Sequence, residues 1–245
     1  MKANARFPIL LLLCLAAPVT LHAGQIMAAG ITEPIADVTL SASVPGIVSA
    51  WKFKEGDFVK QGDVILELDK RLEELETERR KLAMDKNKKD WEALQTLFQK
   101  NSISVRKEEL EKAEADYKIA ATEYEMATEQ LRKRSVAAPT AGYLAEIARD
   151  VGEACQPYQP LIRIVDTRQG YFVSNVEARV AGRLKLDQTA NLEIATGQTV
   201  LKVSGKVVFI SPVVDPASGL QKVRVLFDNA DGRIRPGVAG KLLLD

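Results

Sequence analysis

The sequence contains very little histidine and cysteine, and this scarcity limits its chemistry. Histidine occurs once, at His22, and cysteine twice, at Cys14 and Cys155. Residues 1–23 have the pattern of an export signal, so we expect the mature chain to keep Cys155 alone. Loss of the histidine removes the commonest metal ligand and the commonest general base. A single thiol excludes an intrachain disulfide even in an exported protein. Stability must then come from packing, for which about 220 residues suffice.

The export signal is predicted from the order of three features. Lys2 and Arg6 precede the apolar run "FPILLLLCLAAPV", and the small residues Ala23 and Gly24 follow it. The run is shorter than the roughly 20 residues that span a bilayer, so we expect cleavage near Gly24 rather than an anchor. A lipid on Cys14 is not expected, because leucines precede it where lipoprotein signals have a small residue.

The charge balance excludes another class of function. The chain has 34 basic and 33 acidic residues, and removal of Lys2 and Arg6 with the signal leaves one more acid than base. Such a chain has no overall attraction to nucleic acid or to an anionic membrane. We therefore expect no nucleic-acid partner.

Two long helices are predicted in the middle of the chain. Residues 72–100 contain no glycine or proline and are rich in Glu, Lys, Arg, Leu and Ala, which favours a helix. Ser104 is the predicted N-cap of a second helix. Apolar residues recur in the second helix at alternating steps of three and four, as in a coiled-coil seam: Leu110, Ala113, Tyr117, Ala120, Tyr124, Ala127 and Leu131.

The first helix has a less regular pattern. We interpret Leu72, Leu75 and Leu82 as its seam, interrupted at Lys86 and Lys89 and resumed at Trp91, Leu94 and Phe98. The two helices are expected to form an antiparallel hairpin.

The segments on either side of the hairpin are an internal repeat. Gly46 and Gly56 are ten residues apart, as are Gly142 and Gly152. A shift of 96 residues superposes the two segments. Each copy is too small to bury a core alone, so we expect the two copies to close one shared β core. The superposed apolar pairs are Val48 with Leu144, Val59 with Cys155, Leu66 with Ile162 and Leu68 with Ile164.

The chain after Asp166 reads as short strands with turns. In "LQKVRVLFDN", Val223, Val225 and Phe227 alternate with charged residues, as in a strand with one buried face. The segments "YFVSNVE", "TANLEIA", "LKVSGKVVFISP" and "VAGKLLL" are further strands, and "EARVAGRLK" contains a short helix. A small antiparallel β-barrel is predicted. Across both β regions, structural turns are expected at Gly46, Gly56, Gly62, Gly142, Gly152, Gly205, Pro236 and Gly237.

This order of segments resembles the periplasmic adaptor family, also called membrane fusion proteins, of tripartite efflux pumps of the HlyD/RND type. The similar motifs are "PGIV", "KEGDFVKQGDVILELD" and "AAPTAGYL" in the repeat, and "GKVVFISPVVDPASG" and "FDNADGRIRPGVAGKL" in the barrel. The resemblance implies a mostly β fold with an α-helical coiled-coil hairpin. A lipoyl-like domain, or barrel-sandwich hybrid, is split by the hairpin and followed by a small antiparallel β-barrel.

The domain boundaries follow from these segments. We expect a signal peptide over 1–23, a lipoyl-like domain formed by 24–69 and 136–166, a hairpin over 70–135 and a β-barrel over 167–245. The sequence stops at Asp245, directly after the barrel, so we expect a short form without the membrane-proximal domain of larger adaptors.

The resemblance also implies a function. An adaptor of this family links an inner-membrane efflux transporter, here expected to be of the proton-driven RND type, to an outer-membrane channel. It works in the periplasm as a ring and a structural conduit, associated with the inner membrane through its transporter. No catalytic, cofactor-binding or metal-binding residue is expected, and the protein is not expected to be an enzyme. The channel contact is predicted at the hairpin tip: Leu97, Asn101, Ser102, Ile103 and Ser104. Leu97 and Ser104 match the family's tip pattern, whereas Ala93 stands where an arginine is common.

One alternative uses the lipoyl-like region chemically. The segment "ELDK" at Lys70 resembles the hairpin of a biotin or lipoate carrier, in which a lysine on a tight turn bears the cofactor. Here nearly 70 helical residues follow Lys70, so we expect it to begin the hairpin, with Asp69 as N-cap, and to carry no cofactor. The alternative function is a carrier component of a transferase complex, and a mass shift on Lys70 would favour it.

Overall fold

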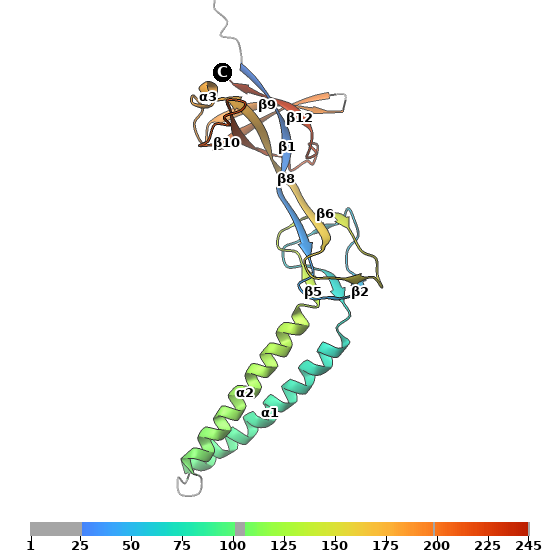
Figure 1. Cartoon of the computed structure of the whole chain (residues 1–245), viewed down its shortest axis with the longest axis vertical. Helices are drawn as coiled ribbons and strands as arrows, with labels where there is room; N and C mark the ends of the chain where they lie inside the picture. The colour runs from blue at the N-terminus through green and yellow to red at the C-terminus, as the bar shows by residue number, and fades with distance from the viewer. Residues whose placement is uncertain (1–25, 101–105, 198, 245) are drawn as a thin grey trace, which may run out of the picture.

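A computed structural model describes residues 26–100, 106–197 and 199–244. The molecule is elongated: a β-barrel lies at one end, a smaller β unit in the middle and a helical hairpin at the other end (Figure 1). The mostly β fold with a helical hairpin is as predicted. None of the helices within the described ranges is both long and apolar enough to span a membrane.

The elements alternate between the three regions along the chain. The helices are α1 (Arg71–Lys100), α2 (Lys107–Arg132) and α3 (Ala178–Ala181). The strands are β1 (Ile26–Ser41), β2 (Gly46–Trp51), β3 (Phe58–Val59), β4 (Val64–Leu68), β5 (Ser135–Ala137), β6 (Gly142–Ile147), β7 (Ala154–Cys155), β8 (Pro160–Glu177), β9 (Thr189–Thr196), β10 (Thr199–Ile210), β11 (Leu220–Asp228) and β12 (Ala239–Leu244).

The barrel closes through six strands in the order β1-β12-β9-β10-β11-β8, with β8 returning to β1. Its core includes Phe172, Leu192 and Leu242, all fully buried. Val223, Val225 and Phe227 point inward, so the predicted alternation along β11 is confirmed. The first strand supplies residues 26–31 to the barrel through β12, a role that the sequence prediction missed because it placed 24–69 in the lipoyl-like domain.

The middle unit, called here the lipoyl-like unit, consists of β2–β7 with the end of β1 and the start of β8. The sheet β5-β4-β2-β7 packs on the extension of the barrel sheet through β8, β6 and β3. Its core is one cluster in which the repeat pairs are buried, including Val59 with Cys155 and Leu66 with Ile162. The interpretation of Cys155 as a small core residue is confirmed.

Two equivalent backbone hydrogen bonds join the two halves of the repeat. The Gly56 amide donates to the Leu144 carbonyl (2.8 Å), and the Gly152 amide donates to the Val48 carbonyl (2.8 Å). Because position 48 corresponds to 144 and position 56 to 152, these are the same contact made twice. The internal repeat is therefore a structural repeat as well.

The predicted turn residues fall into two groups. Gly56, Gly62, Gly152 and Gly237 have positive φ angles, as the prediction requires of turn glycines. Gly46, Gly142 and Gly205 lie in strands β2, β6 and β10, so their assignment to turns was wrong. A side chain at Gly142 would meet the Val165 backbone at 2.9 Å, so close approach of neighbouring strands explains that glycine. Pro236 precedes Gly237 in the loop before β12.

The hairpin confirms one predicted seam and corrects the other. Ala120 and Ala127 are buried on α2, within the seam expected from the sequence. On α1, however, Leu72, Leu75 and Leu82 are exposed. The α1 residues that contact α2 are largely polar in this half. Thr77 donates to the Ala127 carbonyl, Arg80 pairs with Glu123, and Asn87 donates to the Asp116 carbonyl.

The helix starts also differ from prediction by a few residues. The N-cap position of α2 is Arg106, with no side-chain cap, so the assignment of Ser104 as N-cap was wrong. The first residue of α1 is Arg71, and its amide is 3.2 Å from Asp69 Oδ1. Asp69 thus caps the start of α1 as expected, although Lys70 lies just before the helix rather than in its first turn.

Candidate functional site

The hairpin end is the predicted contact site, and Leu97 is its described member. Leu97 lies in the last turn of α1 and is 51% exposed, whereas Leu94 and Phe98 are partly buried towards α2. Asn101, Ser102, Ile103 and Ser104 lie outside the described residues. Leu97 is therefore an apolar group at the end of the molecule farthest from the barrel (Figure 1).

The outer half of the hairpin is fastened by an aromatic stack. Trp91 on α1 and Tyr117 on α2 lie with ring centroids 5.4 Å apart and planes 7° from parallel. Such a pair adds roughly 0.5–1.5 kcal/mol beyond its buried area. This contact holds the two helices together on the approach to Leu97.

In the inner half of the hairpin, α1 and α2 are joined by an ionic contact between arginine and glutamate side chains. Glu76 accepts hydrogen bonds from Arg79 (2.7 Å) and Arg80 (2.7 Å) on its own helix. Arg80 also donates to Glu123 on α2. Hydrogen bonds from Arg79 and then Arg80 lower the pKa of Glu76 to about 2. This ionic layer stands where a regular coiled coil has apolar residues.

The hairpin base is anchored to the lipoyl-like unit by Arg134. Its guanidinium donates to Glu73 at the start of α1 (2.5 Å) and to the Pro45 carbonyl before β2 (3.0 Å). The Arg134 and Glu73 side chains are both mostly buried. One arginine thus ties the first turn of α1 to the end of α2 and to the β unit, which fixes where the hairpin leaves the β core.

Lys70 does not have the setting of a carrier lysine. Its ammonium is 3.2 Å from Glu67, which also pairs with Lys52 at 3.2 Å. These two hydrogen bonds, that from Lys52 first, lower the pKa of Glu67. Lys70 precedes a 30-residue helix instead of occupying a tight turn between strands.

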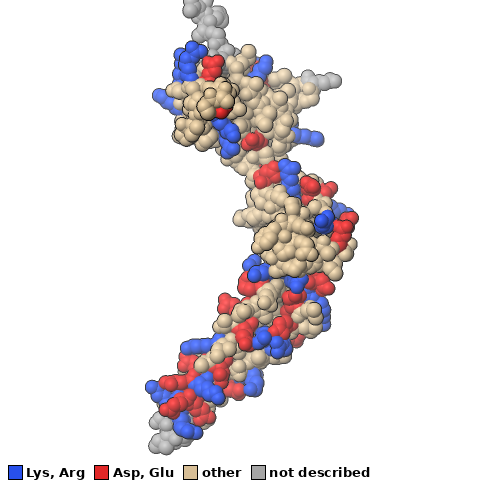
Figure 2. Space-filling model, in the orientation of Figure 1, with Lys and Arg blue, Asp and Glu red and all other residues tan. Residues whose placement is uncertain are grey.

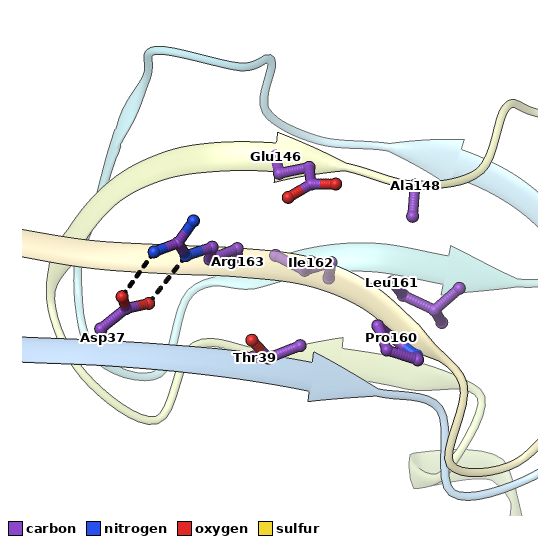
Figure 3. Close-up of a pocket in the computed structure, with 8 residues that line it drawn as sticks. All are labelled: Asp37, Thr39, Glu146, Ala148, Pro160, Leu161, Ile162 and Arg163. Atoms are coloured by element: carbon purple, nitrogen blue, oxygen red, sulfur yellow. Dashed lines mark hydrogen bonds and ion pairs between the residues drawn. The ribbon is translucent and has the colours of Figure 1, made fainter.

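A hollow of about 550 Å³ lies on the lipoyl-like unit between β1, β6 and β8 (Figure 3). Arg163 donates to both oxygens of Asp37, at 2.9 and 2.6 Å. This contact lowers the pKa of Asp37. Glu146 lies on the neighbouring strand and Pro160, Leu161 and Ile162 follow β8 along the hollow. The Asp37 carboxylate is thus ionised and already paired, which does not suit a general base.

A second set of contacts fixes the junction between the lipoyl-like unit and the barrel. Arg168 donates to both oxygens of Asp166, at 3.0 and 2.7 Å. The same guanidinium lies 5.4 Å from the centre of the Phe58 ring, which meets Tyr143 edge-on at 5.2 Å. Phe58 and Tyr143 belong to the lipoyl-like unit, whereas Arg168 follows on β8 towards the barrel. Sequence reasoning missed Arg134 and Arg168, because their partners lie far away in the sequence or carry no motif.

Among the residues that the structure describes, no group of three or more His, Cys, Asp or Glu side chains is arranged to hold a metal ion. Cys155 is fully buried in β7 and packs in the lipoyl-like core.

Two family models match the chain and together cover most of the described residues. The model described as "RND MFP, barrel-sandwich hybrid domain" matches residues 36–167. The model described as "CusB-like, beta-barrel domain" matches residues 173–245. The chain therefore belongs to the RND-type membrane fusion protein family, the periplasmic adaptors of efflux pumps.

Individual relatives are distant. Multidrug resistance protein MdtE of Escherichia coli K12 is 25% identical over 242 residues, covering 88% of this chain and 63% of MdtE. A Haemophilus influenzae protein is 24% identical over 205 residues, covering 83% of this chain and 52% of its own length. The chain thus spans between half and two thirds of these curated relatives.

Solved structures share the fold. A MacA–MexA chimeric protein with the Pseudomonas aeruginosa MexA α-hairpin domain superposes with a TM-score of 0.77 at 19% identity, covering 89% of this chain and 78% of that one. A membrane fusion protein of Streptococcus pneumoniae superposes with a TM-score of 0.70 at 16% identity, covering 90% and 99%. At these identities the likeness concerns the fold.

Proposed function

We propose that the chain is an exported, non-enzymatic adaptor that links an RND-type inner-membrane efflux transporter to an outer-membrane channel. The observation that carries the proposal is the placement of a barrel and a long hairpin at opposite ends of one molecule, with the lipoyl-like unit between them (Figure 1). Such a shape offers two partner surfaces separated by a fixed length. The relative MdtE is a multidrug resistance protein, which supports a role in efflux for this chain.

In this proposal the hairpin end contacts the channel and the barrel end contacts the transporter. The exposed Leu97 side chain supports the first contact, because an apolar group at a hairpin end is free to enter a partner. The proposed contact includes Asn101, Ser102, Ile103 and Ser104. Several copies associate side by side into a ring, which forms a conduit. The protein lies in the periplasm and is held beside the inner membrane by its transporter.

The test is a substitution at the hairpin end in cells whose drug resistance depends on this chain. Leu97→Glu replaces the exposed apolar group with a charge and leaves the α1–α2 contacts intact. We expect normal folding, loss of resistance and loss of crosslinking to the outer-membrane channel. Gln99→Glu, at an exposed position in the same last turn of α1 but about 200° round the helix from Leu97, is the control and should keep both. Full resistance and crosslinking with Leu97→Glu would reject docking through this end.

The alternative carrier function has its own measurement. A lipoyl or biotinyl group on Lys70 would increase the intact mass of the purified protein, and Lys70→Arg would abolish the increase. We expect the unmodified mass and full resistance with Lys70→Arg, because Lys70 is paired with Glu67 at the start of a helix.

A further inference from the structure

Strand β10 of the barrel has one side without a partner over half of its length. β10 pairs with β9 from Thr199 to Lys206, whereas it pairs with β11 only from Gly205 onward. No other strand in the described part of the chain pairs with residues 199–204 on that side. This unpaired side of residues 199–204 is called here the free edge. The β9–β10 hairpin carries it out from the side of the barrel (Figure 1).

The free edge arises because β11 and β10 part. β11 ends at Asp228, and the next amide, that of Asn229, donates to the Arg168 carbonyl (2.9 Å). The chain after β11 therefore stays beside β8, while β10 continues with β9. A hollow of about 310 Å³ lies where the strands part, between residues 204–206 of β10 and residues 226–228 of β11. The hollow gives room for a side chain at the inner end of the free edge.

Backbone hydrogen-bonding groups point outward along the free edge. Alternate residues of an antiparallel strand direct their amide and carbonyl groups to opposite sides. The Val207 amide donates to the Gln188 carbonyl, on the β9 side (2.9 Å). The register from 199 to 206 is unbroken, so the other odd-numbered residues also face β9. The amides and carbonyls of Val200, Lys202 and Ser204, all exposed residues, therefore point to the free edge.

On the outer face of the sheet, a row of alternating charges stops at the free edge. Lys241 of β12 lies opposite Glu193 of β9, and Glu193 lies opposite Lys202 of β10. The Lys202 ammonium is 3.2 Å from Glu193, and the Lys202 side chain is still 80% exposed. Opposite charges on directly opposed residues stabilise neighbouring strands. An acidic residue would continue the alternation on a strand added beside Lys202.

On the inner face of the sheet, the rows that reach the free edge are apolar. Leu242, Leu192 and Val203 lie opposite one another on β12, β9 and β10. In the next row, Ile194 lies opposite Leu201. Val203 and Leu201 are only partly buried against the barrel core. Apolar residues on both sides of the acid of an added strand would extend this core.

The charge of the barrel also favours an acidic partner over a second copy of the chain. Residues 167–245 contain eleven basic and seven acidic residues. Figure 2 shows basic side chains standing out from a largely uncharged barrel surface. Antiparallel pairing of two free edges about Lys202 would set two lysines opposite each other, and like charges in that arrangement are destabilising.

We propose that the free edge binds an extended segment of the transporter in which two apolar residues flank an acidic one. The segment adds to the sheet as a strand antiparallel to β10, as β11 is. Backbone groups of Val200, Lys202 and Ser204 hold it, and the Lys202 ammonium selects the acid. The proposal rests on the proposed function, which places the transporter at the barrel, and names the surface and the kind of segment that meet.

The first test adds a peptide to the full chain and follows amide exchange by NMR. The probe is a peptide of alternating valine and glutamate, VEVEVEV with blocked ends, and the control is VKVKVKV. We expect VEVEVEV to slow exchange at Val200, Lys202 and Ser204 and to bind about fivefold tighter than VKVKVKV. Unchanged exchange at these three amides, or equal binding of the two peptides, would overturn the proposal.

Two substitutions at Lys202 separate the backbone contact from the charge. Lys202→Pro removes an amide that points to the free edge and leaves the bonds to β9 in place, so the barrel should fold and lose the peptide. Lys202→Glu keeps the amide and should reverse the preference, so that VKVKVKV binds more tightly. If Lys202→Pro does not fold, the charge reversal decides. An unchanged preference for VEVEVEV in Lys202→Glu would reject the proposal.

The second test uses a photo-crosslinking residue at Val200 in cells that contain the transporter. We expect a crosslinked product with the transporter, which Lys202→Pro abolishes together with drug resistance. The same residue at Tyr158, exposed on the lipoyl-like unit, is the control and should give no such product.

The outcomes of this test distinguish the free edge from the adaptor function. If the transporter product at Val200 is missing, or if it persists with Lys202→Pro, the free edge is rejected. Drug resistance and channel crosslinking at the Leu97 end would then still support the adaptor function. If only the Leu97→Glu prediction fails, the assignment of the free edge is unaffected.

Discussion

At the scale of single residues, Tyr158 departs from the repeat in which it lies. Position 158 corresponds to Gly62, and both have positive φ, 66° for Tyr158 and 89° for Gly62. Both amides donate to the equivalent carbonyls, Gly62 to Ala138 and Tyr158 to Ala42. A side chain in this conformation costs roughly 1–2 kcal/mol, and the Tyr158 ring gains no burial, since it is 86% exposed. The turn at Tyr158 thus carries a backbone strain that the equivalent turn at Gly62 does not have.

This conformational requirement gives the first prediction. Gly56→Val and Gly152→Val should each lower the free energy of unfolding by about 1–2 kcal/mol, because φ is 90° and 92° at these positions and valine adopts such angles poorly. No heavy atom lies within 4 Å of the Cβ position at either glycine, so we expect backbone strain rather than a clash of the Cβ to cause the loss. Urea unfolding measures the effect.

Tyr158→Gly is the matched control for the same backbone angle. It should raise stability by about 0.5 kcal/mol, since relief of strain exceeds the added chain entropy of glycine. Wild-type stability in both valine variants would show that these turns do not depend on glycine.

At the scale of elements, the hairpin depends on small residues in the α2 seam. Ala120 is 5% exposed, so Ala120→Glu would place a charge in a packed interface and should cost about 2–4 kcal/mol of hairpin stability. We expect circular dichroism to show loss of helix with the β signal retained. Thr122→Glu, at an exposed position on the same helix, should have little effect. Equal loss of helical and β signals would mean that the hairpin does not unfold separately.

The ionic layer of the hairpin predicts a pH dependence. The pKa of Glu76 is about 2 in the folded chain and about 4.5 when unperturbed. A depressed pKa contributes stability that is fully present above pH 4.5 and disappears as the pH falls to about 2.

The melting temperature of the helical signal should therefore differ between wild type and Glu76→Gln by a constant amount above pH 4.5. This difference should vanish near pH 2. Salt should reduce it at every pH, because the pair is exposed. A difference that does not vary with pH would contradict the assignment of the shift to Glu76.

At the scale of the whole molecule, strands β1 and β8 run through both β units and hold them in line. They pair from Gly30 with Ser174 in the barrel to Ser41 with Pro160 in the lipoyl-like unit. The ladder shifts register between Pro34 and Ala36, at the junction. Such an irregularity lets a sheet bend, so side chains near it must set the angle between the barrel and the lipoyl-like unit. Arg168, which contacts Asp166 and Phe58, is placed to do this.

Arg168→Ala should therefore loosen the angle between the units without unfolding either. Spin labels at exposed Lys202 on the barrel and Lys60 on the lipoyl-like unit should show a broader distance distribution in this variant. Arg163→Ala removes a similar two-bond pair with Asp37 inside the lipoyl-like unit, and it should leave the distribution unchanged. Identical distributions in wild type and Arg168→Ala would show that the strand ladder alone fixes the angle.

The sequence by itself determined the features that have a local period. The α2 seam and the alternation along β11 follow from spacing within one segment, and the repeat of Gly56 at Gly152 follows from the comparison of two segments. The structure confirms all three. The exposed position of Leu97 near the hairpin end agrees with the predicted contact, but the contact itself stays a prediction.

The tertiary structure decided the features that depend on residues far apart. No local pattern indicates that β1 closes the barrel against β12, because strand pairing depends on register with a segment more than 200 residues away. The leucines of α1 have the spacing of a seam, yet Leu75 and Leu82 are exposed, and Arg80 lies on the side of α1 that meets α2, where it pairs with Glu123. A spacing shows which residues share a face, and contacts with the rest of the chain decide which face is covered.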